Sequence, residues 1–250
     1  MQHFLSLSDL TSEQFRDLLD LAVELKAEWR EGGNRPLLKG KTLGMIFQKP
    51  SLRTRASFEM GMLHLGGQAL YFSPFEIQLG ERESVADVAR VFSRYVDGVM
   101  ARVFGHQDIL TLAEYSSAPV INGLSDYNHP CQALSDFLTI VEKKGEELRG
   151  LKLAFLGDGN NVATSLLFAA TLTGMDFAIA SPPGYELPDE VWARGERFAA
   201  ASGSELLATH EPQQAAADAD VVYTDVWASM GEEEEAEERA RVFMPYPVNQ

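Results

Sequence analysis

The chain has 250 residues, of which 45% are hydrophobic and 23% are charged, a composition typical of a folded globular protein. Its 37 acidic residues outnumber its 21 basic residues, so the formal net charge is −16. This charge argues against nucleic acid or an anionic membrane as the main partner, but it allows a small basic pocket for an anion. The one cysteine, Cys131, excludes an internal disulfide and a cysteine-based zinc site, and it fits a reducing, cytoplasmic setting.

The first part of the chain alternates between predicted helices and strands. An amphipathic helix is expected over residues 11–30, where Thr11 and Gln14 can form a capping box. Apolar runs predict strands at 41–47, 68–73, 98–104 and 118–123, and the segments between them predict helices at 52–65, 84–95, 108–116 and 130–144. Repeated strand–helix alternation predicts an α/β protein with a parallel sheet.

A second alternation follows a break in the pattern at residues 146–150. Strands are predicted at 151–157, at 176–181 and within 219–227. The sequence therefore predicts two domains, each a parallel sheet flanked by helices. The first spans 1–146 and ends in a linking helix at about 130–146, and the second spans 147–250. No apolar run approaches the roughly eighteen residues that a membrane span requires.

The stretch FQKPSLRTRASFEM predicts the end of a strand, a turn and the start of a helix, with two arginines at that start. A helix N-terminus carries partial positive charge, so cations are normally unfavourable there. The same geometry forms an anion site, because backbone N–H groups point outward. Ser51 can cap the helix, and Arg53 and Arg55 can bind phosphate oxygens bidentately. A bound anion would make their placement favourable, whereas without one they are solvent-facing arginines.

Three further polar side chains lie near the ends of predicted strands and helices. Arg102 lies near the carboxyl end of a strand, where ligands gather in open α/β sheets, although taken alone it is better interpreted as a surface arginine. His129 precedes Pro130 at a helix start, and Gln132 follows shortly after. His129 could donate a hydrogen bond to a carbonyl oxygen, or it could be a capping or packing histidine.

The stretch FLGDGNNVATS resembles a dinucleotide-binding fingerprint only in part. Val162 occupies the position of the third glycine, and the next predicted strand ends in Ser181 instead of an acid for a ribose. Asn160 and Asn161 could hold a small polar substrate or cap a helix. Asp225, at the end of a later strand, could bind a substrate amine or cap a turn.

The motifs occur together in an order that resembles the aspartate/ornithine carbamoyltransferases. They are the Ser51-Leu52-Arg53-Thr54-Arg55 stretch, the segment Gln78-x-Gly80-x-x-Glu83-Ser84, Arg102, His129-Pro130-Cys131-Gln132, the asparagine pair, and Asp225-x-x-x-Ser229-Met230-Gly231. The resemblance runs from the start of the chain to its last residues. It implies an active site in the cleft between the two domains, with no metal and no organic cofactor.

The resemblance also implies a role for each motif in the reaction of carbamoyl phosphate with L-ornithine. Ser51, Leu52, Arg53, Thr54 and Arg55 would hold the phosphate, Leu52 mainly through its backbone N–H. Thr54, Arg102 and His129 would polarise the carbonyl, and Gln132 would hold the amide. Gln78 would reach into a neighbouring subunit's site, which implies a homotrimer. The ornithine-binding residues would be Asn161, Asp225, Ser229 and Met230.

Two departures from the family pattern qualify this expectation. Leu52 replaces a threonine, and the family continues past the last residue with a His-Cys-Leu-Pro segment and a further helix. We therefore expect the second domain to be incomplete in this sequence. The alternatives are a carbamoyltransferase for another amine, such as putrescine, and an inactive, truncated anion-binding paralogue.

Overall fold

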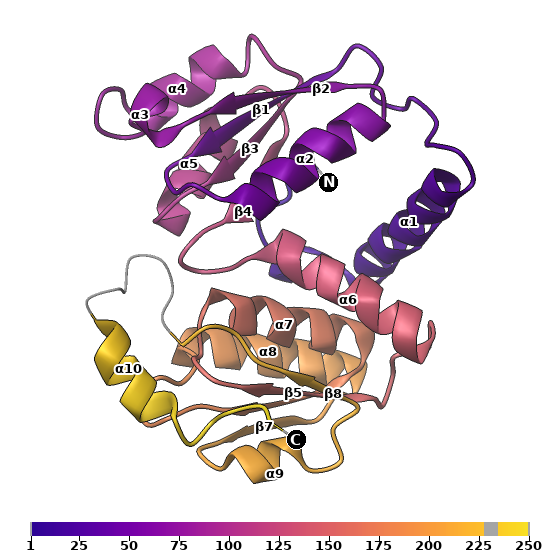
Figure 1. Cartoon of the computed structure of the whole chain (residues 1–250), viewed down its shortest axis with the longest axis vertical. Helices are drawn as coiled ribbons and strands as arrows, with labels where there is room; N and C mark the ends of the chain where they lie inside the picture. The colour runs from indigo at the N-terminus through magenta and orange to yellow at the C-terminus, as the bar shows by residue number, and fades with distance from the viewer. Residues whose placement is uncertain (1, 228–234, 250) are drawn as a thin grey trace. The chain divides into compact units, whose positions relative to one another are not determined.

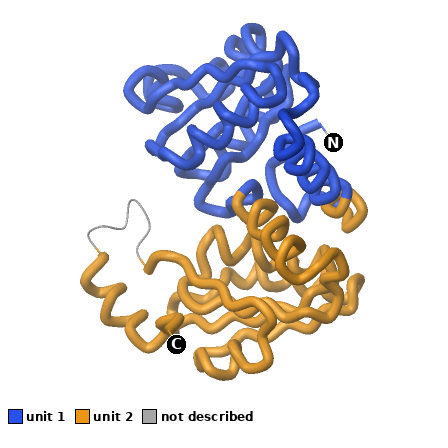
Figure 2. The backbone as a smooth tube through the Cα atoms, turned by 45° about the vertical axis from the view of Figure 1, so that its right-hand side comes forward, with its two compact units in different colours: residues 1–10, 17–131 blue, residues 11–16, 132–250 orange. Residues whose placement is uncertain are grey.

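The computed structural model of the chain describes residues 2–227 and 235–249 (Figure 1). Contacts between Cα atoms divide it into two compact units, residues 1–10 with 17–131 and residues 11–16 with 132–250 (Figure 2). Each unit contains one four-stranded sheet in which all described pairs of strands are parallel. The predicted α/β class is therefore confirmed.

The sheet of the first unit has the strand order β2-β1-β3-β4. Its strands are β1 (Thr42–Phe47), β2 (Gln68–Phe72), β3 (Gly98–Arg102) and β4 (Val120–Leu124). The helices in this part of the chain are η1 (Leu7–Asp9), α1 (Ser12–Arg30), α2 (Leu52–His64), α3 (Pro74–Ile77), α4 (Val85–Phe92) and α5 (His106–Tyr115).

Alternating side chains of β1 pack on opposite faces of this sheet, as the period of two along a strand requires. Met45 and Phe47 lie in a cluster with Met62 of α2. Ile46 lies in the other cluster, with Val88 of α4 and Ile109 of α5 among its members. Because helices cover both faces, β1 is buried along almost its whole length, which explains its uninterrupted apolar sequence.

The sheet of the second unit has the strand order β7-β6-β5-β8. Its strands are β5 (Lys152–Leu156), β6 (Asp176–Ala180), β7 (Leu206–Thr209) and β8 (Val221–Tyr223). The helices in this part of the chain are α6 (Pro130–Lys144), α7 (Asn161–Thr173), α8 (Asp189–Ser202), α9 (Pro212–Ala216) and α10 (Ala236–Phe243).

Helix α7 is buried at every position from Val162 to Leu172. A helix that is apolar all round belongs in the interior of a protein, and α7 packs against both β6 and α8. Hydroxyls of this helix donate to carbonyls of the preceding turn; that of Thr171, for example, donates to the Leu167 carbonyl at 2.8 Å. The buried start of this helix gives the residues that precede it a fixed position.

Most predicted elements are observed within a few residues of their expected bounds. The helix predicted at 84–95 is shorter, Val85–Phe92. The Ser84 hydroxyl caps its start by accepting from the Asp87 N–H at 3.1 Å, and Ser93 caps its end. The strand predicted within 219–227 covers only Val221–Tyr223. The sequence carries no prediction for η1, α3, α8, β7 and α9, whereas α10 begins within the acidic run at 232–238, which is expected to form a solvated helix face.

Candidate active site

The turn between β1 and α2 presents a helix N-terminus closed by Ser51. The Ser51 hydroxyl accepts a hydrogen bond from the Thr54 N–H at 3.4 Å and donates to Thr54 Oγ1 at 3.0 Å. Thr54 is buried, whereas Leu52 is 84% exposed, so Leu52 offers its backbone N–H and little side-chain packing. This is the helix start at which the sequence predicts an anion site, and its capping serine is confirmed.

Arg102 adds a buried positive charge beside that helix start. Arg102 is the last residue of β3, and the residue beside it in the neighbouring strand β1 is Phe47. Arg102 is 8% exposed, and its Nη1 donates to Thr54 Oγ1 at 3.4 Å. Its Nε is buried without a hydrogen-bond partner, and it has no carboxylate partner among the described residues.

The charge on Arg102 is therefore not neutralised by the described part of the protein. Burial, and then the nearby positive charge of Arg53, lower the pKa of the Arg102 guanidinium. Burying a charge without a partner is costly, so Arg102 is a candidate ligand for an anion. Arg53 is exposed and forms no ion pair within residues 2–227 and 235–249, so its guanidinium is also available to an anion.

Arg55 has a different environment from Arg53, although both begin the same helix. Its Nε pairs with Glu59 at 2.8 Å, one turn further along α2. Its guanidinium also lies over the Tyr71 ring, 4.1 Å from the ring centre. The two arginines that the sequence presents as equivalent are thus distinguished by their neighbours.

His129 lies at the end of a loop held by buried amides. Asn122 of β4 donates to Asn128 Oδ1 and to the Leu5 carbonyl, and the Ser125 N–H donates to the Asn128 carbonyl. Burial, and then the charge of Arg102, lower the pKa of His129 to about 4. At neutral pH the imidazole is therefore uncharged, and a neutral imidazole can donate its one N–H to a carbonyl oxygen.

Gln78 closes the four-residue helix α3 in a left-handed conformation, with φ at 42°. Few residues other than glycine adopt this conformation, so the surrounding turn must hold it. The Gly80 N–H donates to the Glu83 carbonyl at 3.1 Å, and the Arg82 N–H donates to the Gln78 carbonyl at 3.1 Å. The side chain of Gln78 lies on this fixed turn.

In the second unit, two predicted residues meet at the carboxyl ends of β5 and β8. Asn160 caps α7, since its Oδ1 accepts from the N–H groups of Val162 and Ala163, and its Nδ2 donates to Asp225 Oδ2 at 3.2 Å. The other Asp225 oxygen accepts from the Val226 N–H at 2.8 Å. Asn161 is the first residue of α7, directly after this cap. Ser229 and Met230 lie outside the described residues.

Gly159, which follows β5, allows a close approach of two backbone segments. A Cβ atom on Gly159 would lie 2.4 Å from the backbone of Glu186 and Leu187, so only glycine fits there. The Gly159 N–H donates to the Tyr185 carbonyl at 2.8 Å. This close approach explains the glycine at position 159 without any role in binding a nucleotide.

A polar network on α6 was not predicted from the sequence. Gln132 Nε2 donates to Asp136 Oδ1 at 2.9 Å, and the Tyr223 hydroxyl donates to Asp136 Oδ2 at 3.0 Å. The spacing of Gln132 and Asp136, one helical turn, is a signal that could have indicated their contact. Tyr223 lies 87 positions from Asp136 in the sequence, and nothing local indicates that pairing.

The thiol of Cys131 is buried in the described part of the chain. Burial raises the pKa of the Cys131 thiol to about 12, so it remains a thiol and packs against the Asn122 carbonyl. Among residues 2–227 and 235–249, no three His, Cys, Asp or Glu side chains gather as they would around a metal ion. No helix within the same ranges is both long enough and apolar enough to cross a membrane.

These features define a two-domain α/β protein with a candidate anion site on one unit and a carboxylate–amide pair on the other. Residues 2–142 match the family description "Aspartate/ornithine carbamoyltransferase, carbamoyl-P binding domain". Residues 149–250 match the companion description "Aspartate/ornithine carbamoyltransferase, Asp/Orn binding domain". The chain belongs to the aspartate/ornithine carbamoyltransferase family, which confirms the resemblance seen in the sequence.

Individual relatives agree with this assignment. Ornithine carbamoyltransferase from Anoxybacillus flavithermus is 54% identical over 247 residues, which cover 99% of this chain and 78% of that protein. The structure of ornithine carbamoyltransferase from Pyrococcus furiosus matches with a TM-score of 0.96 and 53% identity, covering 100% of this chain and 79% of that one. Anabolic ornithine carbamoyltransferase from Campylobacter jejuni matches with a TM-score of 0.94 and 41% identity, covering 100% and 81%.

Proposed function

We propose that the chain is a carbamoyltransferase that transfers the carbamoyl group of carbamoyl phosphate to the δ-amine of L-ornithine, giving L-citrulline and phosphate in arginine biosynthesis. The observation that carries this proposal is the buried Arg102, which has no described carboxylate partner and lies beside a serine-capped helix N-terminus. The doubly charged phosphate group of an acyl phosphate would neutralise this site, and the carbamoyl-P binding description of the family supports carbamoyl phosphate as that compound.

The phosphate of the substrate binds at the start of α2. Ser51, Arg53 and Thr54 supply a hydroxyl, a guanidinium and a second hydroxyl, and the Leu52 N–H points out of the same helix turn. Arg55 contributes a weaker contact, because it would have to loosen its pair with Glu59 to reach the phosphate. This division of roles gives the two arginines separable effects on binding.

The carbonyl oxygen of the carbamoyl group accepts hydrogen bonds from Thr54, Arg102 and His129. The neutral δ-amine attacks the carbamoyl carbon, and negative charge develops on that oxygen. Fixed donors stabilise this charge, and the loss of one typically costs about 3 to 4 kcal/mol. The C–O bond to phosphate then breaks with its electron pair, and the departing phosphate takes the proton released by the amine. Gln132 holds the carbamoyl amide, and no cofactor is required.

The ornithine-binding residues are Asn161, Asp225, Ser229 and Met230. The Asp225 carboxylate is held at two points, by Asn160 and by the Val226 N–H, and a fixed carboxylate suits the α-ammonium group of an amino acid. Aspartate as substrate would instead require extra cations for its second carboxylate. We also propose that residues 1–146 form the carbamoyl-phosphate-binding domain and residues 147–250 the ornithine-binding domain.

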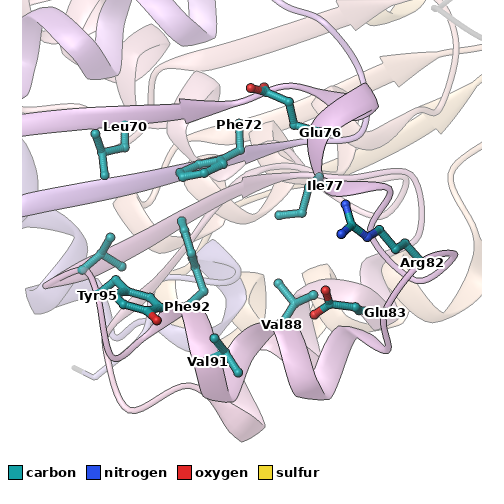
Figure 3. Close-up of a pocket in the computed structure, with 11 residues that line it drawn as sticks. Leu70, Phe72, Glu76, Ile77, Arg82, Glu83, Val88, Val91, Phe92 and Tyr95 are labelled. Atoms are coloured by element: carbon teal, nitrogen blue, oxygen red, sulfur yellow. The ribbon is translucent and has the colours of Figure 1, made fainter.

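We further propose that the protein acts in the cytoplasm as a homotrimer, with Gln78 reaching the site of a neighbouring subunit. Next to the Gln78 turn lies an apolar pocket of about 450 Å³, whose lining includes Ile77 and Phe92 (Figure 3). Tyr95 and Val91, which also line it, are 78% and 54% exposed, and Phe75 on α3 is 89% exposed. Exposed apolar side chains of this extent support a subunit contact here. Sedimentation of a Val91→Asp variant, against the unchanged chain, tests this contact.

Detection of citrulline from carbamoyl phosphate and ornithine tests the main proposal, with putrescine and aspartate as competing acceptors. We expect product with ornithine alone. Product with putrescine alone would replace the amine in our proposal, and no product with any amine would support an anion-binding protein without transferase activity. An Arg53→Ala variant should lose activity, whereas the matched Arg30→Ala variant, at the exposed end of α1, should retain it.

A further inference from the structure

The Asp136 side chain accepts one hydrogen bond on each of its two carboxylate oxygens. Gln132 Nε2 donates to Oδ1 at 2.9 Å, and the Tyr223 hydroxyl donates to Oδ2 at 3.0 Å. The Tyr223 ring is itself held in a stack on Phe155 of β5, with ring centres 5.8 Å apart. Asp136 is therefore a fixed acceptor, with its geometry set by the sheet of the second unit.

A carboxylate is an acceptor only, whereas a glutamine amide has one donating and one accepting end. Asp136 therefore selects one of the two orientations of the Gln132 amide. The Nε2 group faces the carboxylate, because the flipped orientation would place the amide oxygen against a negative oxygen. The accepting end, Oε1, is directed away from the Asp136 contact.

We propose that Asp136 is a positioning residue that orients the Gln132 amide, so that Gln132 offers an acceptor to the –NH2 group of carbamoyl phosphate. This inference rests on the proposed function, in which Gln132 holds the carbamoyl amide. The –NH2 group of carbamoyl phosphate carries two N–H donors, and a donor from Gln132 in that place would repel it. Tyr223 supports the same orientation by fixing the second carboxylate oxygen.

Opposing effects act on the protonation of Asp136. Burial, and also the nearby charge of Asp225, raise its pKa, whereas the hydrogen bonds from Gln132 and Tyr223 offset part of this rise by favouring the charged carboxylate. Burial and the neighbouring Asp136 charge raise the pKa of the Tyr223 phenol, so the hydroxyl keeps its proton and remains a donor.

A purely structural tie between α6 and β8 would predict a different pattern of losses. Such a tie would weaken the binding of all ligands together, through a general loss of stability. An orienting role concerns only ligands that carry the carbamoyl amide. Inorganic phosphate lacks that group, so phosphate and carbamoyl phosphate separate the two explanations.

The test uses the full chain with the substitutions Asp136→Asn, Tyr223→Phe and Gln132→Glu, and the double variant Gln132→Glu/Asp136→Asn. Glu142→Gln, which changes an exposed carboxylate on the same helix, is the matched control. Citrulline formation gives kcat and the KM for carbamoyl phosphate, and calorimetry gives the Kd for inorganic phosphate. Thermal unfolding confirms that each variant is folded.

We expect Asp136→Asn to raise the KM for carbamoyl phosphate about tenfold or more, with the Kd for phosphate unchanged within about twofold. Tyr223→Phe should give a smaller shift in the same direction. In the Gln132→Glu background, Asp136→Asn should have the opposite effect and increase activity. There, the amide introduced by Asp136→Asn can donate to the carboxylate introduced by Gln132→Glu, which leaves one oxygen of that carboxylate as the acceptor for the –NH2 group. The double variant should therefore be more active than Gln132→Glu alone.

Two results would overturn the inference by itself. One is an active wild-type chain whose Asp136→Asn variant keeps its KM for carbamoyl phosphate. The other is a parallel loss of phosphate and carbamoyl phosphate binding, with additive effects of the two substitutions in the double variant. A wild-type chain that binds phosphate but forms no citrulline with ornithine would instead refute the proposed function, and the inference with it.

Discussion

Replacement of Arg102 by methionine is expected to stabilise the anion-free protein and, at the same time, to remove its affinity for phosphate. Arg102 is 8% exposed, its Nε has no hydrogen-bond partner, and its contact with Thr54 is 3.4 Å long. A buried charge without a partner costs several kcal/mol, and a weak hydrogen bond returns about 1 kcal/mol. Methionine fills similar space without charge, so the free energy of unfolding should rise by about 1 to 3 kcal/mol.

Arg239 provides a matched control for this prediction, because it is also 8% exposed but is paired. Its Nη1 lies 2.6 Å from Asp158, and its Nε lies 3.2 Å from Glu235. Loss of one partner from a buried pair leaves the other uncompensated, which typically costs about 3 to 5 kcal/mol. Arg239→Met should therefore destabilise the fold, in the opposite direction to Arg102→Met.

Thermal unfolding with and without phosphate measures both effects. For a protein of this size, each kcal/mol corresponds to about 2 to 4 °C in Tm. Phosphate at a hundred times its Kd should add about 2.7 kcal/mol to the wild type and nothing to Arg102→Met. A lower Tm of Arg102→Met in phosphate-free buffer, or an undiminished phosphate shift, would refute the argument from the unpaired charge.

Three further predictions concern neighbouring features. Arg53→Ala should raise the Kd for phosphate by about tenfold to a hundredfold, whereas Arg55→Ala, whose guanidinium is already paired with Glu59, should change it less than about threefold by calorimetry. Gly159→Ala should lower the free energy of unfolding in urea by about 1 to 3 kcal/mol, because its Cβ would meet backbone at 2.4 Å. Burial lowers the His129 pKa from 6.5 to about 4, so on acidification the unfolded state takes up a proton at a higher pH than the folded state does. The stability that the neutral imidazole contributes is therefore present above pH 6.5 and is lost as the pH falls toward 4. Midpoints of urea unfolding measured across that pH range, for the unchanged chain and for His129→Gln, measure this loss. If the midpoint fell equally with pH in the two proteins, the prediction would be contradicted.

The sequence was sufficient for the local features of the candidate anion site. A strand, a turn with Ser51 and a helix N-terminus are all set by neighbouring residues, and the structure has each within a residue or two of its expected place. The long apolar runs of β1 and β5 also predicted buried parallel strands, because helices on both faces leave no polar side.

Features that depend on distant residues could not be predicted in this way. The pairing of Arg55 with Glu59 follows a helical spacing and was open to prediction, but the stack of Arg55 on Tyr71 depends on strand order. The Asp136–Tyr223 hydrogen bond joins residues far apart in the sequence. The burial of Arg102 depends on how β3 lies beside β1, and its sequence neighbours carry no signal of it.

The overall charge of the chain strengthens the meaning of the unpaired Arg102. Acidic side chains outnumber basic ones by 37 to 21, so carboxylates are the most available partners for any arginine. The buried Arg239 has two of them, whereas the buried Arg102 is influenced by the positive charge of Arg53 and has no carboxylate partner among the described residues. A protein with an excess of acids that keeps them away from one buried guanidinium preserves a positive potential there. That potential is useful only to an anion from outside the chain, and it opposes the general repulsion that a net charge of −16 exerts on phosphate esters.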